Sequence, residues 1–205
     1  MVGEAAKFVQ QLTMNKGVSY MEDIFMAWEI DPSHSEVMFS VRHAMISTVR
    51  GHFNVISGHL HIDDQNPANS WVDAQVDASS INTREERRDG HLKSPDFFDV
   101  AKYPTITFKS NKVEHVGGSD YKVTGDLTMH GVTKQVTFSA EYGGQGNDAF
   151  GMHRAGISVK GKINREDWGL TYNAALEAGG VLVSKDVTIE IDLSAVNQPV
   201  AAPAN

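Results

Sequence analysis

Alternating hydrophobic and polar residues mark the first extended stretch of the chain. Between Val37 and Met45 the odd positions are mostly apolar, whereas Ser40 and Arg42 on the even positions are polar. A period of two is typical of a β-strand with one buried and one solvent-facing side. The buried side also carries one imidazole, that of His43. We therefore predict a strand whose inner face is apolar except for a single histidine.

The next run, from Thr48 to Ile62, changes its pattern part-way along. Phe53 and Val55 share one face, but the later apolar residues Ile56, Leu60 and Ile62 have the opposite parity. One extra residue near Val55 would reconcile the two halves, so we predict a β-bulge that bends the strand there. With this correction the histidines of the run point outward: His52, His59 and His61.

Further runs with the same period follow along the chain. They cover residues 72–78, 105–109, 121–129, 132–140, 149–163 and 181–193. In the run 149–163 we expect His153 to point inward together with Ala155, Ile157, Val159 and Ile163. In the last run, odd positions from Val181 to Leu193 share one face, and Lys185 lies among them.

The clearest prediction is a hairpin at His130-Gly131. A two-residue turn there pairs Met129 with Val132, and further back Val123 with Phe138. The intervening pairs are Leu127 with Lys134 and Gly125 with Val136. This register leaves the apolar residues on one face, so turn and pattern predict the same pairing.

One segment has a helical pattern. Thr83 to Leu92 begins with Thr83 as the expected N-cap and Glu86 as its capping-box partner. The predicted helix is polar, so we expect it at a rim of the fold. The connection after it contains two adjacent aromatic residues, Phe97 and Phe98, which we expect to plug an opening.

About eight strands with short links, one helix and no alternation of strands with helices predict an all-β, antiparallel barrel. A barrel of this size is either filled by its own side chains or holds one small ligand. We assign residues 28–196 to this domain. Residues 1–27 form an N-terminal extension, partly helical or disordered, and residues 197–205 a disordered tail.

Composition narrows the functions that fit this barrel. The chain has no cysteine among its 205 residues, which excludes disulfides, thiolate metal sites and cysteine nucleophiles. Its formal net charge is −8, and no basic cluster suits a nucleic acid. No apolar window is long enough for a spanning helix or for the core of a signal peptide. The sequence as written therefore predicts a cytoplasmic protein without a membrane span.

Several short motifs together resemble the YceI-like family. They are Val41-Arg42-His43, Thr48 to Phe53, Ser80 to Thr83, Arg88 to Leu92, Asp96 to Asp99, Tyr103-Pro104 and Leu127 to Thr133. The resemblance spans roughly Trp28 to Val196. It implies a lipocalin-like barrel whose long apolar cavity holds an isoprenoid or another long-chain lipid, a homodimer, and no catalytic set. Many relatives are exported, which leaves the periplasm open as a location. Relatives often carry Asp-Phe-Gly where this chain has Asp167-Trp168-Gly169, so a larger ring is expected near the cavity.

On this hypothesis the inward-facing apolar residues bind the lipid, because each buried CH₂ group contributes about 0.8 kcal/mol. No cofactor other than such a ligand is expected. The predicted lipid-binding residues are Phe39, Val41, His43, Phe53, Val76, Phe97, Phe98, Ile106, Phe108, Leu127, Val136, Phe138, His153, Ile157, Val159, Trp168, Val187 and Ile189.

Two alternatives stay open at this stage. The same apolar residues could pack against one another in a filled barrel that serves only in dimerisation. The barrel could instead be an enzyme acting on a lipid-like substrate, with His43 or His153 as acid–base group, or with His59 and His61 as part of a metal site. The sequence contains neither a Gly-x-Ser-x-Gly motif nor a glycine-rich phosphate loop ahead of a helix.

Overall fold

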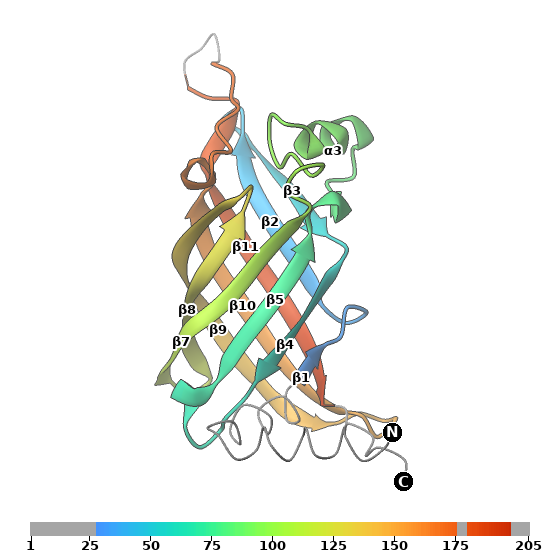
Figure 1. Cartoon of the computed structure of the whole chain (residues 1–205), viewed down its shortest axis with the longest axis vertical. Helices are drawn as coiled ribbons and strands as arrows, with labels where there is room; N and C mark the ends of the chain where they lie inside the picture. Colours follow the sequence, from blue (N-terminus) through green and yellow to red (C-terminus); the bar gives the residue numbers. More distant parts are fainter. Residues whose placement is uncertain (1–27, 176–179, 198–205) are drawn as a thin grey trace, which may run out of the picture.

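A single antiparallel sheet curls round and closes on itself (Figure 1). The computed structural model describes residues 28–175 and 180–197. The expected N-terminal extension lies outside the described residues, as does the predicted tail 197–205 except for Asn197, which belongs to β11. The strands of the sheet are β1 (Trp28–Ile30), β2 (Glu36–His43), β3 (Ser47–Phe53), β4 (Ile56–His61), β5 (Trp71–Asp77), β6 (Ile81–Asn82), β7 (Thr105–Gly117), β8 (Asp120–Met129), β9 (Val132–Asn147), β10 (His153–Asn164) and β11 (Val183–Asn197).

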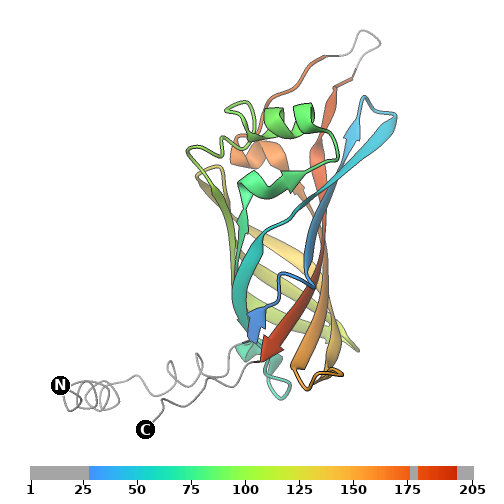
Figure 2. The same cartoon turned by 90° about the vertical axis from the view of Figure 1, so that its right-hand side faces the viewer.

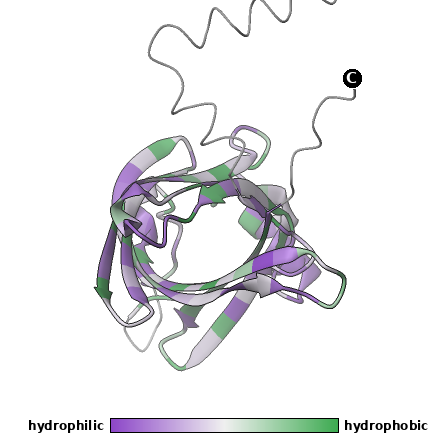
Figure 3. Ribbon diagram, turned by 90° about the horizontal axis from the view of Figure 1, so that it is seen from below, coloured by the Kyte–Doolittle hydropathy of each residue, from purple (hydrophilic) through white to green (hydrophobic). Residues whose placement is uncertain are grey.

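Strand β11 closes the barrel. One edge of β11 pairs with β10 along its length, and the other edge pairs with β2 and, further on, with β1. β1 also pairs with β4, and β2 pairs with β3, so β1 and β2 follow one another in one position of the ring. β3 and β4 share the next position, and β5 and β6 the one after it. With β7 to β11 this gives a ring of eight positions, seen along its axis in Figure 3, and confirms the predicted antiparallel barrel.

The parity change in the run 48–62 is a strand break rather than the predicted bulge. β3 ends at Phe53 and pairs with β2 and β6, whereas β4 starts at Ile56 and pairs with β1 and β5. The backbone amides at the break find partners outside the ladder, because Asn54 N donates to the Ser80 carbonyl (3.3 Å) and Val55 N donates to Ser80 Oγ (3.2 Å). The chain therefore changes partners at this point and does not insert one unpaired residue.

The hairpin between β8 and β9 has the predicted register. Met129 pairs with Val132, Leu127 with Lys134, Gly125 with Val136 and Val123 with Phe138. His130 and Gly131 at the turn have φ values of 52° and 74°. Left-handed φ at both central residues is typical of a type I′ turn, whose twist matches that of the flanking strands.

The helix starts later than predicted. Helix α3 spans Glu86–Lys93, and Glu85 is its N-cap, because its carboxylate accepts hydrogen bonds from the backbone amides of Arg87 (3.1 Å) and Arg88 (2.7 Å). Thr83 is buried and has a different role. Its backbone N and Oγ1 both donate to Asp89 Oδ1, and Arg88 Nε donates to Thr83 Oγ1 (2.6 Å). The described residues also contain three short 3₁₀ helices: η1 (Pro67–Asn69), η2 (Ala78–Ser80) and η3 (Arg165–Trp168).

The barrel wall is interrupted at the end where α3 lies. β5 ends at Asp77, η2 follows, and β6 pairs only with β3, so no ladder joins β6 to β7. Helix α3 and the segment 94–104 lie over this end of the barrel (Figure 2). We call it the α3 end, and the opposite end, where the chain enters at Trp28, the β1 end.

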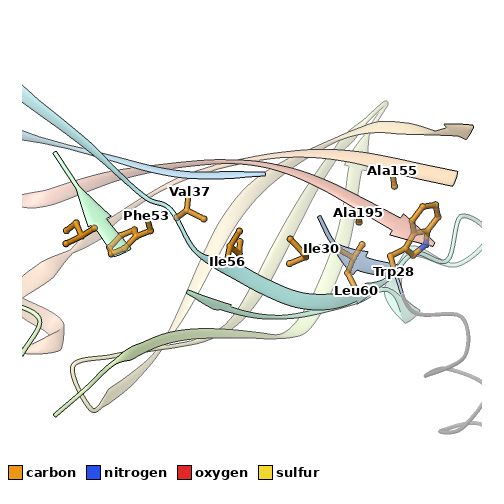
Figure 4. Close-up of a cluster of buried hydrophobic side chains, with 9 residues drawn as sticks. Trp28, Ile30, Val37, Phe53, Ile56, Leu60, Ala155 and Ala195 are labelled. Carbon is orange, nitrogen blue, oxygen red and sulfur yellow. The ribbon is translucent and has the colours of Figure 1, made fainter. Parts of the chain in front are cut away.

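Two clusters of buried apolar side chains hold the barrel together. One follows the line of β1 to β4 and contains Trp28, Ile30, Val37, Phe53, Ile56, Leu60, Ile81, Ala155 and Ala195 (Figure 4). The other joins β8, β9 and β10 to η3 and contains Leu127, Met129, Phe138, Ile163, Trp168 and Leu170. Their positions fit the period-two pattern, since inward residues alternate along each strand.

A polar cluster near the β1 end gives the fold a pH dependence. Arg154 of β10 contacts the carboxylates of Asp31 (2.6 Å) and Asp148 (2.7 Å). Hydrogen bonds from Ser33, Arg154 and His34 hold the pKa of Asp31 well below its ordinary value. A carboxyl group with a lowered pKa contributes stability above its unfolded pKa of about 3.9, and this contribution is lost as the pH falls further.

We therefore expect the free energy of unfolding to fall as the pH drops below about 4, and expect Asp31→Asn to reduce this slope. Urea denaturation of both proteins between neutral and acid pH measures the difference. If Asp31→Asn leaves the slope unchanged, the acid sensitivity comes from other carboxylates.

Candidate ligand-binding cavity

The barrel encloses a cavity of about 1030 Å³. Its wall is formed by side chains from β2 to β5 and from β7 to β11, with α3 and the segment after it at one end. Most of these side chains are aliphatic or aromatic. A wall of this kind offers few hydrogen bonds to water. The cavity therefore suits an apolar molecule.

All but three of the residues predicted to bind lipid line this cavity. On the strands they are Phe39, Val41, His43, Phe53, Val76, Ile106, Phe108, Leu127, Phe138, Ile157, Val159, Val187 and Ile189, and at the α3 end Phe97 and Phe98. Contact with a ligand stays a prediction for each of them. The period of the strands was sufficient to place these side chains on the inner face.

Two glycines explain how large aromatic rings line the wall without filling the cavity. A Cβ atom on Gly51 would lie 2.5 Å from Cζ of Phe39, and one on Gly161 would lie 2.2 Å from Cδ1 of Phe138. Each ring therefore lies against a glycine of a neighbouring strand, where no other side chain could fit. This packing keeps the two rings close to the wall and leaves the middle of the barrel open.

Three predicted residues do not line the cavity. Val136 packs at the edge of the second apolar cluster, beside Gly125 of the next strand. Trp168 is only 2% exposed, and its Nε1 donates to the Leu127 carbonyl (3.1 Å), so the ring is part of the packing around η3. His153 lies at the β1 end, against the ring of Trp28 (5.2 Å between centroids), with Nδ1 2.8 Å from Asn147 Oδ1.

The structure places the two alternative acid–base histidines of the enzyme hypothesis far apart. In the ladders with β11, His43 pairs with Val183 and His153 with Asn197, so they lie at opposite ends of the barrel. Of the other pair, His59 is exposed, whereas His61 lines the cavity against our expectation, with its ring near that of Trp71. Among residues 28–175 and 180–197, no three or more His, Asp or Glu side chains are grouped so that they could hold a metal ion.

Lys185 also departs from its predicted place. The ladder of β11 with β2 shifts register between Val183 and Val187. This irregularity leaves Lys185 exposed, where its Nζ lies 2.8 Å from Glu166 Oε2. The apolar face of β11 is therefore continuous on either side of the shift, and the lysine does not face the cavity.

A buried arginine at the α3 end is not among the residues that the sequence pattern predicts. Arg165 lines the cavity, is 4% exposed, and donates to the carbonyls of Ser184 (3.0 Å), Leu170 and Val183. Burial lowers the pKa of its guanidinium from the ordinary value. These bonds join η3 to the start of β11. No periodic pattern includes Arg165, since it comes from a turn, and this explains why it was missed.

The polar residues that line the cavity differ in charge between the two ends. The α3 end has Arg87, Arg88 and Arg165 with one carboxylate, Glu85, and is net positive, whereas Asp63 and Asp64 are in the loop after β4. Tyr142 also lines the cavity, and burial raises the pKa of its phenol to about 12. Its hydroxyl is buried without a hydrogen-bond partner among the described residues. A ligand thus meets positive charge near α3 and a neutral hydroxyl and carboxylates elsewhere.

An eight-stranded antiparallel barrel around an apolar cavity is the architecture of lipocalin-like binding proteins. Comparison with known sequences gives the particular family. A YceI-like domain matches residues 28–195. A UPF0312 protein of Staphylococcus aureus strain MSSA476 is 40% identical over 161 residues, which cover 78% of this chain and 91% of that protein. The chain therefore belongs to the YceI-like family.

Solved structures agree with this assignment. The YceI protein of Campylobacter jejuni is 33% identical, with a TM-score of 0.66 over 77% of this chain and 90% of that one. Burkholderia cenocepacia BcnA is 22% identical, with a TM-score of 0.71 over 80% of this chain and 98% of that one. A polyisoprenoid-binding domain from Saccharophagus degradans is 18% identical, with a TM-score of 0.63 over 83% and 98%. The last two likenesses concern the fold alone. Within the described residues no helix is long and apolar enough to cross a membrane.

Proposed function

We propose that this protein binds a long-chain apolar lipid in its barrel and sequesters or carries it. The observation that supports this proposal is the cavity of about 1030 Å³ with its largely apolar wall. Pockets for drug-sized ligands measure roughly 300–1,000 Å³, so this volume suits a molecule at or above that size. A long hydrocarbon chain gains about 0.8 kcal/mol for each CH₂ group that it buries, which favours long ligands in long cavities.

The name of one structural neighbour supports an isoprenoid as the ligand class. The Saccharophagus degradans domain is described as polyisoprenoid-binding. Prenyl and alkyl chains present nearly the same surface to an apolar wall, so isoprenoid quinones and fatty acids or amides belong to the same proposal. We propose a binding function without turnover. Of the two candidate acid–base groups, His153 lies beyond the cavity, and His43 lines it at the other end of β11 among mostly apolar side chains.

We further propose that the ligand enters at the α3 end. The wall is interrupted there between β6 and β7, and several residues that line the cavity at this end are exposed, among them Glu85, Arg87 and Tyr172. At the β1 end, the buried side chains of Trp28, Leu60, Ala155 and Ala195 pack together. A polar headgroup would then lie near the arginines at the α3 end, with the tail directed toward the β1 end.

Mass spectrometry tests the proposal directly. The purified protein is extracted with organic solvent and also measured intact under native conditions. We expect a near-stoichiometric long-chain species in the extract and the matching mass increase in the intact protein. A protein that carries no such species, and that takes up neither prenols nor fatty amides when they are added, would contradict the proposal. The native spectra also measure the homodimer that the family resemblance predicts.

A further inference from the structure

The turn between β2 and β3 exposes apolar side chains at the α3 end. It consists of Ala44, Met45 and Ile46, and Figure 2 shows this hairpin reaching past the barrel beside the start of β11. Met45 is 55% exposed and Ile46 is 81% exposed. Exposed apolar residues are common singly, but two adjacent ones at the tip of a protruding hairpin need a reason.

The backbone of this turn does not favour the residues that occupy it. Ala44 and Met45 have φ values of 47° and 62°, and Ile46 N donates to the His43 carbonyl (3.2 Å). Turns with two left-handed residues strongly prefer Asn-Gly, because other side chains strain the backbone there. This chain instead has alanine and methionine at the two positions. Strained positions of this kind often occur at functional sites, where the surrounding structure holds them.

Contacts beneath the tip hold it in place. The Arg42 guanidinium donates to the carbonyls of Met45 (3.1 Å) and Ile46 (3.4 Å) and to Thr48 Oγ1 (3.2 Å). Ala44 N donates to the Leu182 carbonyl (2.7 Å), which fixes the hairpin to the segment before β11. The apolar side chains are therefore presented on an ordered support.

The surroundings of the tip suit the surface of a lipid bilayer. His43 and Leu182, which lie next to the turn, both line the cavity. Arg42 and Arg50 are the only side chains of formal charge, histidines aside, between Val37 and Phe53, and both are exposed. An apolar tip with arginines behind it matches the acyl and headgroup layers of a membrane, in the manner of interfacial anchors.

We propose that Met45 and Ile46 insert into the surface of a lipid bilayer, so that the α3 end of the barrel docks on the membrane from which lipid is taken or to which it is delivered. This inference goes beyond ligand binding, since it concerns a second site with a different partner. It predicts that the protein binds vesicles that contain no prenol or other cavity ligand, and that this binding depends on Met45 and Ile46 and not on the cavity.

The decisive variant replaces the strained pair by the residues that the turn prefers. Ala44→Asn with Met45→Gly and Ile46→Ser removes the apolar tip and relieves the backbone, so we expect an unchanged or raised Tm. Vesicles of phosphatidylethanolamine and phosphatidylglycerol are sedimented with each protein. We expect the partition coefficient of the variant to fall roughly 10- to 100-fold. Phe150→Ser is the matched control, because Phe150 is 92% exposed in the turn between β9 and β10 at the other end.

Uptake of a prenol delivered from cyclodextrin is measured on the same samples, and we expect the triple variant to retain it. Wild-type protein that does not bind vesicles, or a triple variant that binds them as the wild type does, would overturn docking whatever the prenol result. An equal loss of vesicle binding in Phe150→Ser would also overturn docking. A change from dimer to monomer in the triple variant, seen by light scattering without loss of vesicle binding, would assign the tip to a second copy of the chain instead.

Discussion

Replacing Ala140 with tryptophan is expected to abolish binding of a long prenol while leaving the barrel folded. Ala140 is buried, lies in the middle of β9 between Tyr121 and Val159, and lines the cavity. An indole at this position would extend across the cavity and block the path of a tail toward the β1 end. The loss of about five buried CH₂ groups at about 0.8 kcal/mol each amounts to about 4 kcal/mol, or roughly a thousandfold in affinity.

The experiment compares hexaprenol with farnesol, which has half its length. Titration followed by tryptophan fluorescence or native mass spectrometry should show hexaprenol binding lost and farnesol binding largely retained, because the short chain fits on the α3 side of the new ring. Ser139→Trp adds the same ring to the outer face of β9, since Ser139 is exposed, and should bind both prenols normally. If Ala140→Trp binds hexaprenol as the wild type does, the ligand does not occupy the middle of the barrel.

The second large effect is expected for Arg165→Met. The methionine keeps much of the length and apolar contact but removes the donor of the Leu170 and Ser184 carbonyls, whereas the Val183 carbonyl still accepts from Asn173 Nδ2 (2.8 Å). Each buried acceptor without a partner costs about 1–3 kcal/mol, so we expect a loss of about 3–5 kcal/mol in the free energy of unfolding.

Urea denaturation measures this loss, with Lys162→Met as the control. Lys162 is exposed and lies 3.7 Å from Asp186 in an exposed ion pair, which is worth less than about 1 kcal/mol. Arg165→Lys keeps the charge but cannot reach the three carbonyls in the same geometry, so an intermediate loss is expected. A loss no larger than that of Lys162→Met would mean that the carbonyls find other partners when the guanidinium is absent.

The sequence was most informative where two independent signals met. At His130-Gly131 the turn residues and the period of both strands require the same register, and the structure has that register. Near Val55 only the parity change was visible. A bulge and a change of partner strand produce the same parity change, and the contacts with Ser80 that decide between them come from residues far along the chain. Pairing of distant strands was therefore the part that local patterns did not specify.

The period of a strand also predicts which face of the sheet a residue lies on, but not its position along the barrel axis. His153 has the parity of Ala155 and Ile157, yet it lies beyond the cavity at the β1 end. Thr83 shows that a local sequence motif can also mislead about a helix cap. Its spacing from Glu86 fits a capping box, but Arg84 has a φ of 65°, and the Thr83 hydroxyl donates to Asp89 instead of capping the first turn. Arg165 has no sequence signal at all, because its function arises from three carbonyls brought together by the fold.

Because the wall is interrupted between β6 and β7, we expect the lifetime of a bound lipid to be independent of the stability of the barrel. Helix α3, which lies over this end, has no fully buried side chain, whereas below the interruption the ladder between β5 and β7 closes the ring of strands. Segments with few buried contacts open at a much lower free energy than the whole domain unfolds. On the entry route proposed above, a lipid that leaves past α3 is therefore expected to do so faster than the barrel unfolds, and substitutions in α3 are expected to change the residence time of the ligand without changing the melting temperature.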